Sequence, residues 1–264
     1  MLISIITPVY NGEVFIENCI RNVIDQNCLD LEHVIIDGGS SDDTANILKK
    51  YSHEYSHIQW LSEKDRGQSD AMNKGISMAK GEIIGFLNVD DYYEPGVLNR
   101  IKVIFGKIPE PSLVVGNCNV WGPDGQLMYI NTPSRLTLFD LTSGRQYPVN
   151  PSSYFYHKSL HDLTGPYNIY DEYSMDLDFL LRAVQHAHKF YFDEIWGNFR
   201  FFEGTKTYND TYDGQAVQRI NCLFDKYRKN LGYGKRIHSR INFFIHESNI
   251  HLKRLLSNYL NRSL

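Results

Sequence analysis

Two adjacent carboxylates follow a short apolar run in the segment IIGFLNVDDYYEP, residues 83–95. Residues 83–87 are apolar or glycine, and Asn88, Asp90 and Asp91 come almost directly after them. Neighbouring carboxylates repel each other unless positive charge lies close by. A divalent cation, a lysine or the N-terminus of a helix could supply that charge. Mg²⁺ and Mn²⁺ prefer oxygen ligands, and Mg²⁺ is often held by one or two carboxylates together with substrate phosphates.

Three loops upstream have a similar chemical character. They are TPVYN (7–11), DGGSSDD (37–43) and EKDRGQSDAMNKG (63–75), and the last two are rich in Gly, Asp, Asn and Ser. In the third loop Gly67 permits a tight turn. Arg66 is either a surface residue or a phosphate ligand, because a guanidinium group matches phosphate geometry.

The elements that carry these loops alternate regularly over the first hundred residues. Strands are predicted at 2–7, 33–36, 58–61 and 82–87, and helices at 13–25, 44–51, 69–79 and from Pro95 onward. Short apolar strands alternating with helices predict a parallel sheet covered on both faces. The loops at the carboxyl ends of such strands converge on one crevice, where ligands bind.

After Phe105 the alternation weakens. Extended segments are predicted at 113–116, 153–157 and 191–196, and a helix at 175–186. WGPDGQ (121–126) has the composition of a turn. The last fifty residues have a helical pattern that breaks at LGYGK (231–235).

Composition points to an ordinary globular chain. Of the 264 residues, 42% are hydrophobic and 22% charged, and no stretch approaches the roughly 18 apolar residues of a membrane span. The N-terminus lacks the basic region of a signal peptide. The four cysteines have neither metal-site spacing nor the density of a disulfide framework. We therefore expect a reduced, cytoplasmic location.

The charge is distributed unevenly along the chain. Residues 226–264 carry nine Lys or Arg and one acid, Glu247, for a net charge of +8, whereas the remainder carries −12. From about Lys235 onward, apolar residues recur at helical spacing: Ile237, Ile241, Phe244, Ile245, Leu252, Leu255, Leu256 and Tyr259. This pattern predicts an amphipathic helix. It would either contact an anionic membrane, at the inner face of the cytoplasmic membrane, or pack on the protein itself or a second subunit. Nucleic acid is not an expected partner.

The four loops, in this order and spacing, resemble the GT-A fold of family 2 glycosyltransferases. The resemblance covers residues 1–110 strongly and 111–205 more weakly. It implies an α/β fold with a Rossmann-like, mostly parallel central sheet flanked by helices. The expected division is a glycosyltransferase domain at 1–207, with a nucleotide-sugar half (1–110) and an acceptor half (111–207), followed by a helical C-terminal extension at 208–264.

In such enzymes a nucleotide-sugar lies across the carboxyl ends of the first four strands. The resemblance therefore implies that Tyr10 lies against the nucleobase and that Asp37 and Asp65 accept hydrogen bonds from base or ribose. The alternatives are a core aromatic for Tyr10 and a turn-forming residue for Asp37. Gly38 stands where the family often has a second acid. The predicted nucleotide-sugar-binding residues are Pro8, Tyr10, Asn11, Asp37, Asp65, Arg66, Asp70, Asn73, Asn88, Asp90 and Lys206.

NVDD corresponds to the family's Asp-X-Asp motif, with Asn88 in the first position. The resemblance implies that Asp90 and Asp91 bind Mg²⁺ or Mn²⁺ together with the donor diphosphate. Asn88 offers an oxygen but no charge, which should weaken the site. The alternative is an acidic turn before the next helix.

The catalytic base is predicted in DEYSMDLDFLLRA (171–183). Asp176 stands where the family has its catalytic acid, although Met175 replaces a frequent Glu. Asp178 points to another side of the helix, so Asp176 is preferred. NPSSYFYHKSL (150–160) would floor the acceptor site. FRFFEGTKT (199–207) resembles a loop that closes over the donor, where Arg200 and Lys206 would neutralise the diphosphate and Phe202 replaces a frequent histidine.

The resemblance thus predicts an inverting, metal-dependent glycosyltransferase of hexosyltransferase type. It would move one sugar from a nucleoside-diphosphate sugar to a saccharide or lipid-linked saccharide acceptor in surface polysaccharide biosynthesis. The Gln-X-X-Arg-Trp motif of processive members is absent. Two alternatives remain, namely a catalytically silent nucleotide-sugar-binding or scaffold protein, and a nucleotidyltransferase. The latter would need a basic loop after the first strand, but TPVYNGEVF has no Lys or Arg.

Overall fold

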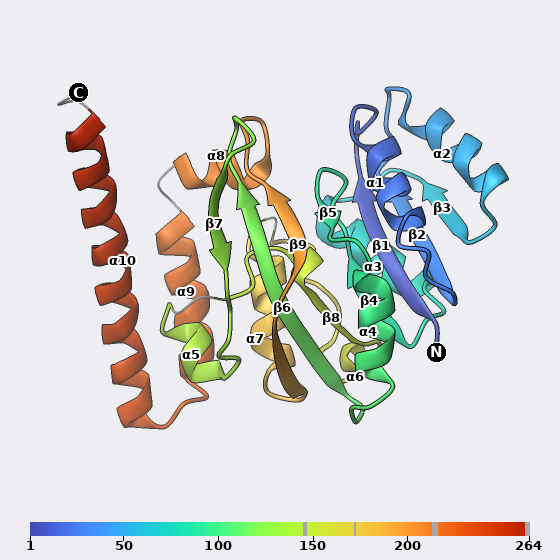
Figure 1. The fold of residues 1–264 in the computed structure, drawn as a ribbon. Helices are drawn as coiled ribbons and strands as arrows, with labels where there is room; N and C mark the ends of the chain where they lie inside the picture. Colours follow the sequence, from blue (N-terminus) through green and yellow to red (C-terminus); the bar gives the residue numbers. More distant parts are fainter. Residues whose placement is uncertain (145–146, 172, 213–215, 262–264) are drawn as a thin grey trace.

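A computed structural model describes residues 1–144, 147–171, 173–212 and 216–261 (Figure 1). For residues 211–212 and 249–261 it describes the backbone alone. The segments of the predicted apolar stripe at 252–259 therefore lie outside the residues whose side chains are described.

The described strands form one sheet, in the order β3-β2-β1-β4-β8-β6-β9-β5, with β7 beside β6. The first four strands are parallel: β1 (Ile3–Val9), β2 (Leu31–Asp37), β3 (Ile58–Ser62) and β4 (Ile83–Phe86). The remaining strands are β5 (Tyr92–Tyr93), β6 (Ser112–Trp121), β7 (Leu127–Asn131), β8 (Tyr154–His157) and β9 (His188–Arg200). Strand β8 runs antiparallel to both β4 and β6 and so joins the two halves of the sheet.

The helices cover both faces of the sheet. They are α1 (Ile16–Ile24), α2 (Thr44–Glu54), α3 (Gln68–Met78), α4 (Val97–Phe105), α5 (Leu138–Thr142), the short 3₁₀ helix η1 (Pro151–Ser153), α6 (Leu160–Thr164), α7 (Met175–Ala183), α8 (Lys206–Tyr212), α9 (Ala216–Arg228) and α10 (Tyr233–Asn261). In β1, Ile3 and Ile5 pack with residues of α1 and α4, whereas Ile6 packs with residues of α3. Strands buried on both faces are expected for a parallel sheet.

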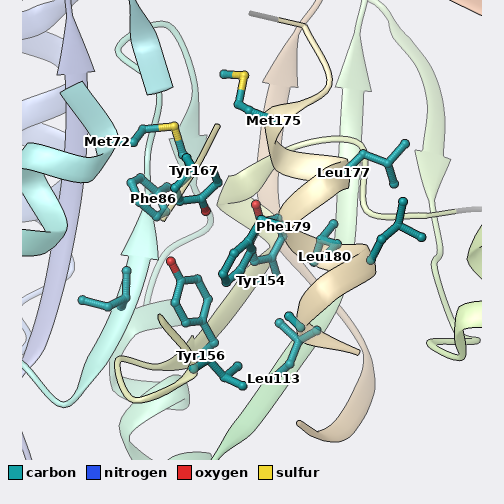
Figure 2. Close-up of a cluster of buried hydrophobic side chains, with 14 of the residues drawn as sticks. Met72, Phe86, Leu113, Tyr154, Tyr156, Tyr167, Met175, Leu177, Phe179 and Leu180 are labelled. Carbon is teal, nitrogen blue, oxygen red and sulfur yellow. The ribbon is translucent and has the colours of Figure 1, made fainter. Parts of the chain in front are cut away.

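A second part of the core lies between the sheet and α7. Figure 2 shows Met72 of α3 and Phe86 of β4 facing Tyr154 and Tyr156 of β8 and Phe179 of α7. This cluster joins the nucleotide-binding half of the predicted division to the acceptor half. The predicted domain boundary at residue 207 falls inside α8, and the division stays a prediction.

The predicted strands and helices of the first hundred residues are confirmed, with corrections at two helix starts. The helix predicted from residue 13 begins at Ile16, and the helix predicted from Pro95 also begins later. The helix there begins at Val97, because Gly96 adopts a left-handed conformation (φ 78°) that precedes the first helical residue. The helix predicted at 175–186 ends at Ala183. The two-residue strand β5 and the five-residue helices α5 and α6 were not predicted.

The C-terminal helices follow the predicted pattern. Helix α9 ends at Arg228 and α10 begins at Tyr233, so the break at LGYGK is confirmed. Buried Arg228 joins α9 to its neighbours by donating to the Thr142 carbonyl (2.7 Å) and to Ser239 Oγ (3.2 Å). Helix α10 lies along the outer edge of the molecule (Figure 1). Within the described part of the chain, no helix combines the length and apolar content needed to cross a membrane.

Candidate active site

Asp37 closes the turn at the end of β2. Its carboxylate is buried and accepts hydrogen bonds from Ser40 N (3.1 Å), Ser40 Oγ (2.5 Å) and, across to β3, Ser62 Oγ (2.6 Å). A carboxylate held this way fixes the backbone of residues 38–40 at the sheet edge. Both oxygens of Asp37 are thus engaged by the protein.

The side chain of Asp65 lies against Gly38, which has no side chain of its own. A Cβ atom on Gly38 would lie 2.7 Å from Asp65 Oδ2, closer than van der Waals contact allows. Asp65 in turn accepts from the Gly67 N–H (2.9 Å), which fixes the turn before α3. The carboxylate of Asp65 therefore fills the space that a second acid at position 38 would need.

The loop after β1 is fastened to the loop after β2. Asn11, with a left-handed φ of 48°, accepts from Ser41 N (2.9 Å) and its own N–H donates to Ser40 Oγ (2.7 Å). Pro8 is buried within β1, whereas the side chain of Tyr10 is 66% exposed. The alternative of a core aromatic at Tyr10 is therefore wrong, and its ring is open to a ligand.

The start of α3 is occupied by contacts within the protein. Arg66 is exposed and pairs with Asp70 at 3.2 Å, and Lys74 lies 3.7 Å from the same carboxylate. Asn73 donates to the Tyr167 carbonyl and accepts from the Tyr167 N–H, both at 2.9 Å. These bonds anchor the segment before α7 to α3. They leave the predicted roles of Arg66, Asp70 and Asn73 toward a nucleotide as predictions.

Asp91 is fixed by one neighbouring residue and by two residues that are distant in sequence. It is 3% exposed, and its carboxylate accepts from Asn150 Nδ2 (2.7 Å), Asn88 Nδ2 (3.0 Å) and the Arg200 backbone N–H (3.1 Å). All three donors are neutral amides. Burial, and then the charge of Asp90, raise the pKa of Asp91 well above its ordinary value.

Asp90 is the more open member of the pair. It is partly exposed, and burial raises its pKa although its own backbone N–H and the charge of Arg200 act in the opposite direction. The guanidinium of Arg200 lies over the rings of Phe15 and Phe202, 5.7 Å from each centroid. Among the described residues, the donors to Asp91 are neutral and the charge of Arg200 only partly offsets the effect of burial on Asp90.

These carboxylates could hold a metal ion only together with further oxygen ligands from outside the described residues. Within the described residues, no group of three or more His, Cys, Asp or Glu side chains is placed to hold a metal ion. Asn88 directs its oxygen to Gln68 Nε2 (3.1 Å). Asp90 and Asp91 suit a hard cation that takes its remaining oxygens from a diphosphate, because Mg²⁺ is commonly bound by one or two carboxylates and substrate phosphates.

The two acids at the start of α7 differ sharply. Asp178 is buried and accepts from Tyr227 Oη (2.8 Å), Arg182 Nε (2.9 Å) and Lys226 Nζ (3.0 Å). Burial works to raise its pKa, but the bonds from Tyr227 and Lys226 outweigh this and hold the pKa below its ordinary value. Asp178 therefore ties α7 to α9.

Asp176 has no such partners. Its Oδ1 atom is buried without a hydrogen bond from any described residue, although the residue as a whole is partly exposed. Burial raises the pKa of Asp176 to about 7, and the nearby charge of Asp171 adds to this. The hydroxyl of Tyr154 lowers the same pKa and lies beside the carboxyl, outside good hydrogen-bond geometry. A carboxyl with a pKa near neutrality suits a general base.

One segment links the two acid pairs. Asn150 bonds Asp91, the turn of η1 follows, and Tyr154 at the start of β8 lies beside Asp176. Asn150, Tyr154 and the aromatic contact of Phe15 to Arg200 were not predicted as site residues. NPSSYFYH marked the segment as a whole, but which of its side chains face the acids follows only from the fold.

Two further residues of the predicted segments lie away from the carboxylates or at the edge of the site. His157, in the segment 150–160, is packed against Phe105 and accepts from the Ser112 N–H (3.0 Å), so it does not reach the carboxylates. Lys206 is exposed at the first position of α8. The backbone of Arg200 reaches Asp91, which brings the end of β9 to this edge of the sheet.

Comparison with known proteins gives the following likenesses. Residues 4–168 match the family model described as glycosyl transferase family 2. A PGL/p-HBAD biosynthesis glycosyltransferase of Mycobacterium bovis is 31% identical over 190 residues, which is 69% of this chain and 69% of that protein. The uncharacterized glycosyltransferase EpsJ of Bacillus subtilis is 36% identical over 100 residues, 38% of this chain but only 29% of its own length.

Two solved structures have the same fold at low sequence identity. Residues 1–349 of S. aureus TarS, in complex with UDP-GlcNAc, give a TM-score of 0.69 at 18% identity, covering 92% of this chain and 72% of that one. The mannosyltransferase PcManGT of Pyrobaculum calidifontis, in complex with GDP-Man and Mn²⁺, gives 0.65 at 15% identity, covering 90% and 68%. These likenesses confirm the predicted α/β, GT-A type of fold.

Proposed function

The chain belongs to glycosyltransferase family 2, and from this premise we propose that it transfers one sugar from a nucleoside-diphosphate sugar to an acceptor hydroxyl. The observation that carries the proposal is Asp176. The residue is partly exposed, one of its carboxyl oxygens is buried without a hydrogen bond from the described part of the chain, and its pKa is about 7. Tyr154 and Asn150 connect it to the carboxylates after β4. A base can take the proton of the acceptor hydroxyl, and a cation-binding edge can stabilise the leaving diphosphate.

The chemistry follows from these positions. The nucleotide lies across the loops after β1–β3, with Tyr10 against the base and Asp37 and Asp65 at the edge of the sheet. Asp176 takes the proton of the acceptor hydroxyl. At the same time the oxygen of that hydroxyl bonds to the anomeric carbon, and the bond from that carbon to the diphosphate breaks. Because this is a single displacement with no enzyme nucleophile, the anomeric configuration inverts.

Negative charge on the leaving diphosphate is balanced by groups other than Asp176. Asp90, beside Asp91, would hold Mg²⁺ or Mn²⁺, which supplies positive charge to the departing phosphate oxygens. The guanidinium of Arg200, held by Phe15 and Phe202, and the ammonium of Lys206 add to this charge. A relative in structure was solved with GDP-Man and Mn²⁺, which supports this assignment.

The donor and acceptor are proposed by class. Relatives in structure bind UDP, UDP-GlcNAc or GDP-Man, so a hexose-bearing nucleoside diphosphate is the expected donor. The proposed acceptor is a saccharide or lipid-linked saccharide in the biosynthesis of a surface polysaccharide. The proposed place of the transfer is the cytoplasm. A catalytically silent sugar-nucleotide binder is the second candidate, favoured by Asn88 in the first position of the metal motif.

Product analysis tests the proposal. A panel of labelled UDP- and GDP-sugars is incubated with Mn²⁺ and saccharide acceptors, with Asp176→Asn as the control. Release of a nucleoside diphosphate together with a glycosylated acceptor is expected from the unmodified chain only. Pyrophosphate as the product would indicate a nucleotidyltransferase instead. Donor binding without transfer to any acceptor would support the silent binder.

A further inference from the structure

Helix α10 has an apolar face that the molecule leaves uncovered. Ile237, Ile241, Phe244 and Ile245 are each 44–54% exposed, although they are large hydrophobic side chains. At 3.6 residues per turn these four positions share one side of the helix. The opposite side carries the buried residues Ser239 and Phe243, which pack toward α5 and α9. The apolar stripe therefore points away from the body of the protein, at the outer edge seen in Figure 1.

Exposed basic residues lie close to this stripe in the sequence. Lys235 and Arg240 are exposed on α10, and Lys229 is exposed directly after the end of α9. Asp225 neutralises part of this charge through its ion pair with Arg240 (2.9 Å). The segment from Lys226 to the C-terminus nevertheless keeps a net charge of +8, since Glu247 is its single acid.

Charge selects the partner of this face. A symmetric dimer through α10 would bring two copies of the same surface together, and with them two segments of net charge +8. Unlike such a dimer, an anionic lipid surface offers both apolar depth for the stripe and opposite charge for the lysines and arginines. The helix is 29 residues long, which is within the common range for helices that lie in a membrane interface.

We propose that α10 lies in the plane of an anionic membrane surface, with Ile237, Ile241, Phe244 and Ile245 inserted and the basic residues at the lipid headgroups. The contact does not depend on transfer activity. If the proposed function holds, it keeps the enzyme at a surface where lipid-linked acceptors are concentrated.

Vesicle flotation tests the contact on the full chain. Vesicles of phosphatidylcholine alone are compared with vesicles containing about 30% phosphatidylglycerol, at low and physiological salt. The unmodified protein should float with the anionic vesicles, more strongly at low salt. The double variant Ile241→Ser/Phe244→Ser should lose at least about tenfold in binding, because its apolar insertion is reduced.

The matched control lies on another exposed apolar surface. Leu127 and Met128 on β7 are 46% and 50% exposed, and Leu127→Ser/Met128→Ser should leave flotation unchanged. Lys235→Glu should weaken binding about fivefold and reduce its salt dependence. Thermal shift with UDP and GDP, measured without lipid, should be the same for all variants, so that loss of membrane contact is distinguished from loss of the donor site.

Three results would overturn the proposal. One is the absence of flotation of the unmodified protein with anionic vesicles. Another is an equal loss of binding in the β7 control. The third is a lipid-free dimer, measured by sedimentation, that Ile241→Ser/Phe244→Ser dissociates, because a second copy of the chain would then cover the stripe.

Discussion

The loop after β4 and the start of α7 each carry two carboxylates close in sequence, and the protein treats the two pairs alike in one respect. In each pair one acid is fixed, Asp91 by three amide N–H groups and Asp178 by a phenol and two cations. The other acid, Asp90 or Asp176, stays partly open. An acid that is fixed by neighbours cannot also reach a substrate freely.

The pairs differ in what fixes the closed acid. Cations balance Asp178, and its pKa is lowered, so the start of α7 needs no further charge. Neutral amides hold Asp91, and its pKa is raised well above the ordinary value. The carboxylates after β4 are therefore not fully balanced by the positive charge of the described residues, and Asp176 on α7 has an oxygen that accepts no hydrogen bond from them. A bound cation would balance the first pair, and an acceptor hydroxyl would donate to the second.

The largest expected effect comes from Asp176→Asn. The amide cannot take a proton, so turnover should fall by roughly 10²- to 10⁴-fold while donor binding stays unchanged. The same change should stabilise the protein at alkaline pH. Because the pKa of Asp176 is about 7 when folded and near 3.8 when unfolded, its burial costs nothing below pH 4 and most above pH 7. Steady-state kinetics and melting at pH 4.5 and 8 measure both effects.

The melting measurements on Asp176→Asn can contradict the prediction independently of the kinetics. The gain in melting temperature of Asp176→Asn should be larger at pH 8 than at pH 4.5, on the order of a few degrees. An equal gain at both pH values would mean that Asp176 ionises normally in the folded chain. Loss of donor affinity together with turnover would place Asp176 in the donor site.

The second expected effect concerns Asp90. In the unmodified protein, Mg²⁺ or Mn²⁺ should raise the affinity for UDP or GDP by about tenfold or more, and Asp90→Asn should remove that gain. Calorimetric titration of nucleotide with and without metal measures it. Asp124→Asn, in the exposed turn between β6 and β7, is the control. Identical affinities with and without metal in the unmodified chain would contradict the metal assignment.

Asp178→Asn should act on stability instead of chemistry. Its carboxylate joins α7 to Lys226 and Tyr227 of α9, so its loss should lower the free energy of unfolding by about 1–3 kcal/mol. Turnover at a temperature where the variant is folded should change little. Denaturant titration and activity at low temperature separate the two effects. A loss of turnover equal to that of Asp176→Asn would reverse the roles of these two acids.

Much of this arrangement could be predicted from local sequence. Alternating apolar runs predicted β1–β4 and the helices between them, and the acids after β2, β3 and β4 marked one edge of the sheet. Helices α5 and α6 are too short, at five residues, to show a periodic pattern. They depend on tertiary packing.

The sequence could not tell which acid of each pair stays open. The partners of Asp91 lie 59 and 109 positions away at Asn150 and Arg200, and Tyr227 lies 49 positions from Asp178. The same holds for Gly38, where the missing acid could be understood only once Asp65 was seen to fill its place. Spacing predicts where a carboxylate lies in an element, whereas its charge state depends on neighbours that the fold supplies.

The smallest expected effect is that of Tyr154→Phe on the pH profile. The groups that act on the pKa of Asp176 are the Tyr154 hydroxyl, which lowers it, and Asp171, which raises it, on a background of burial. Removing the hydroxyl should therefore raise the pKa, so the acid limb of kcat/KM moves to higher pH. Turnover at pH 8.5 should be nearly unchanged, because the carboxyl is ionised there in both proteins. The control is Tyr51→Phe, which removes a buried phenol on α2 that donates to Glu17. This change should not move the acid limb. A limb that stays in place, or moves to lower pH, would show that Tyr154 does not help set the charge of the base.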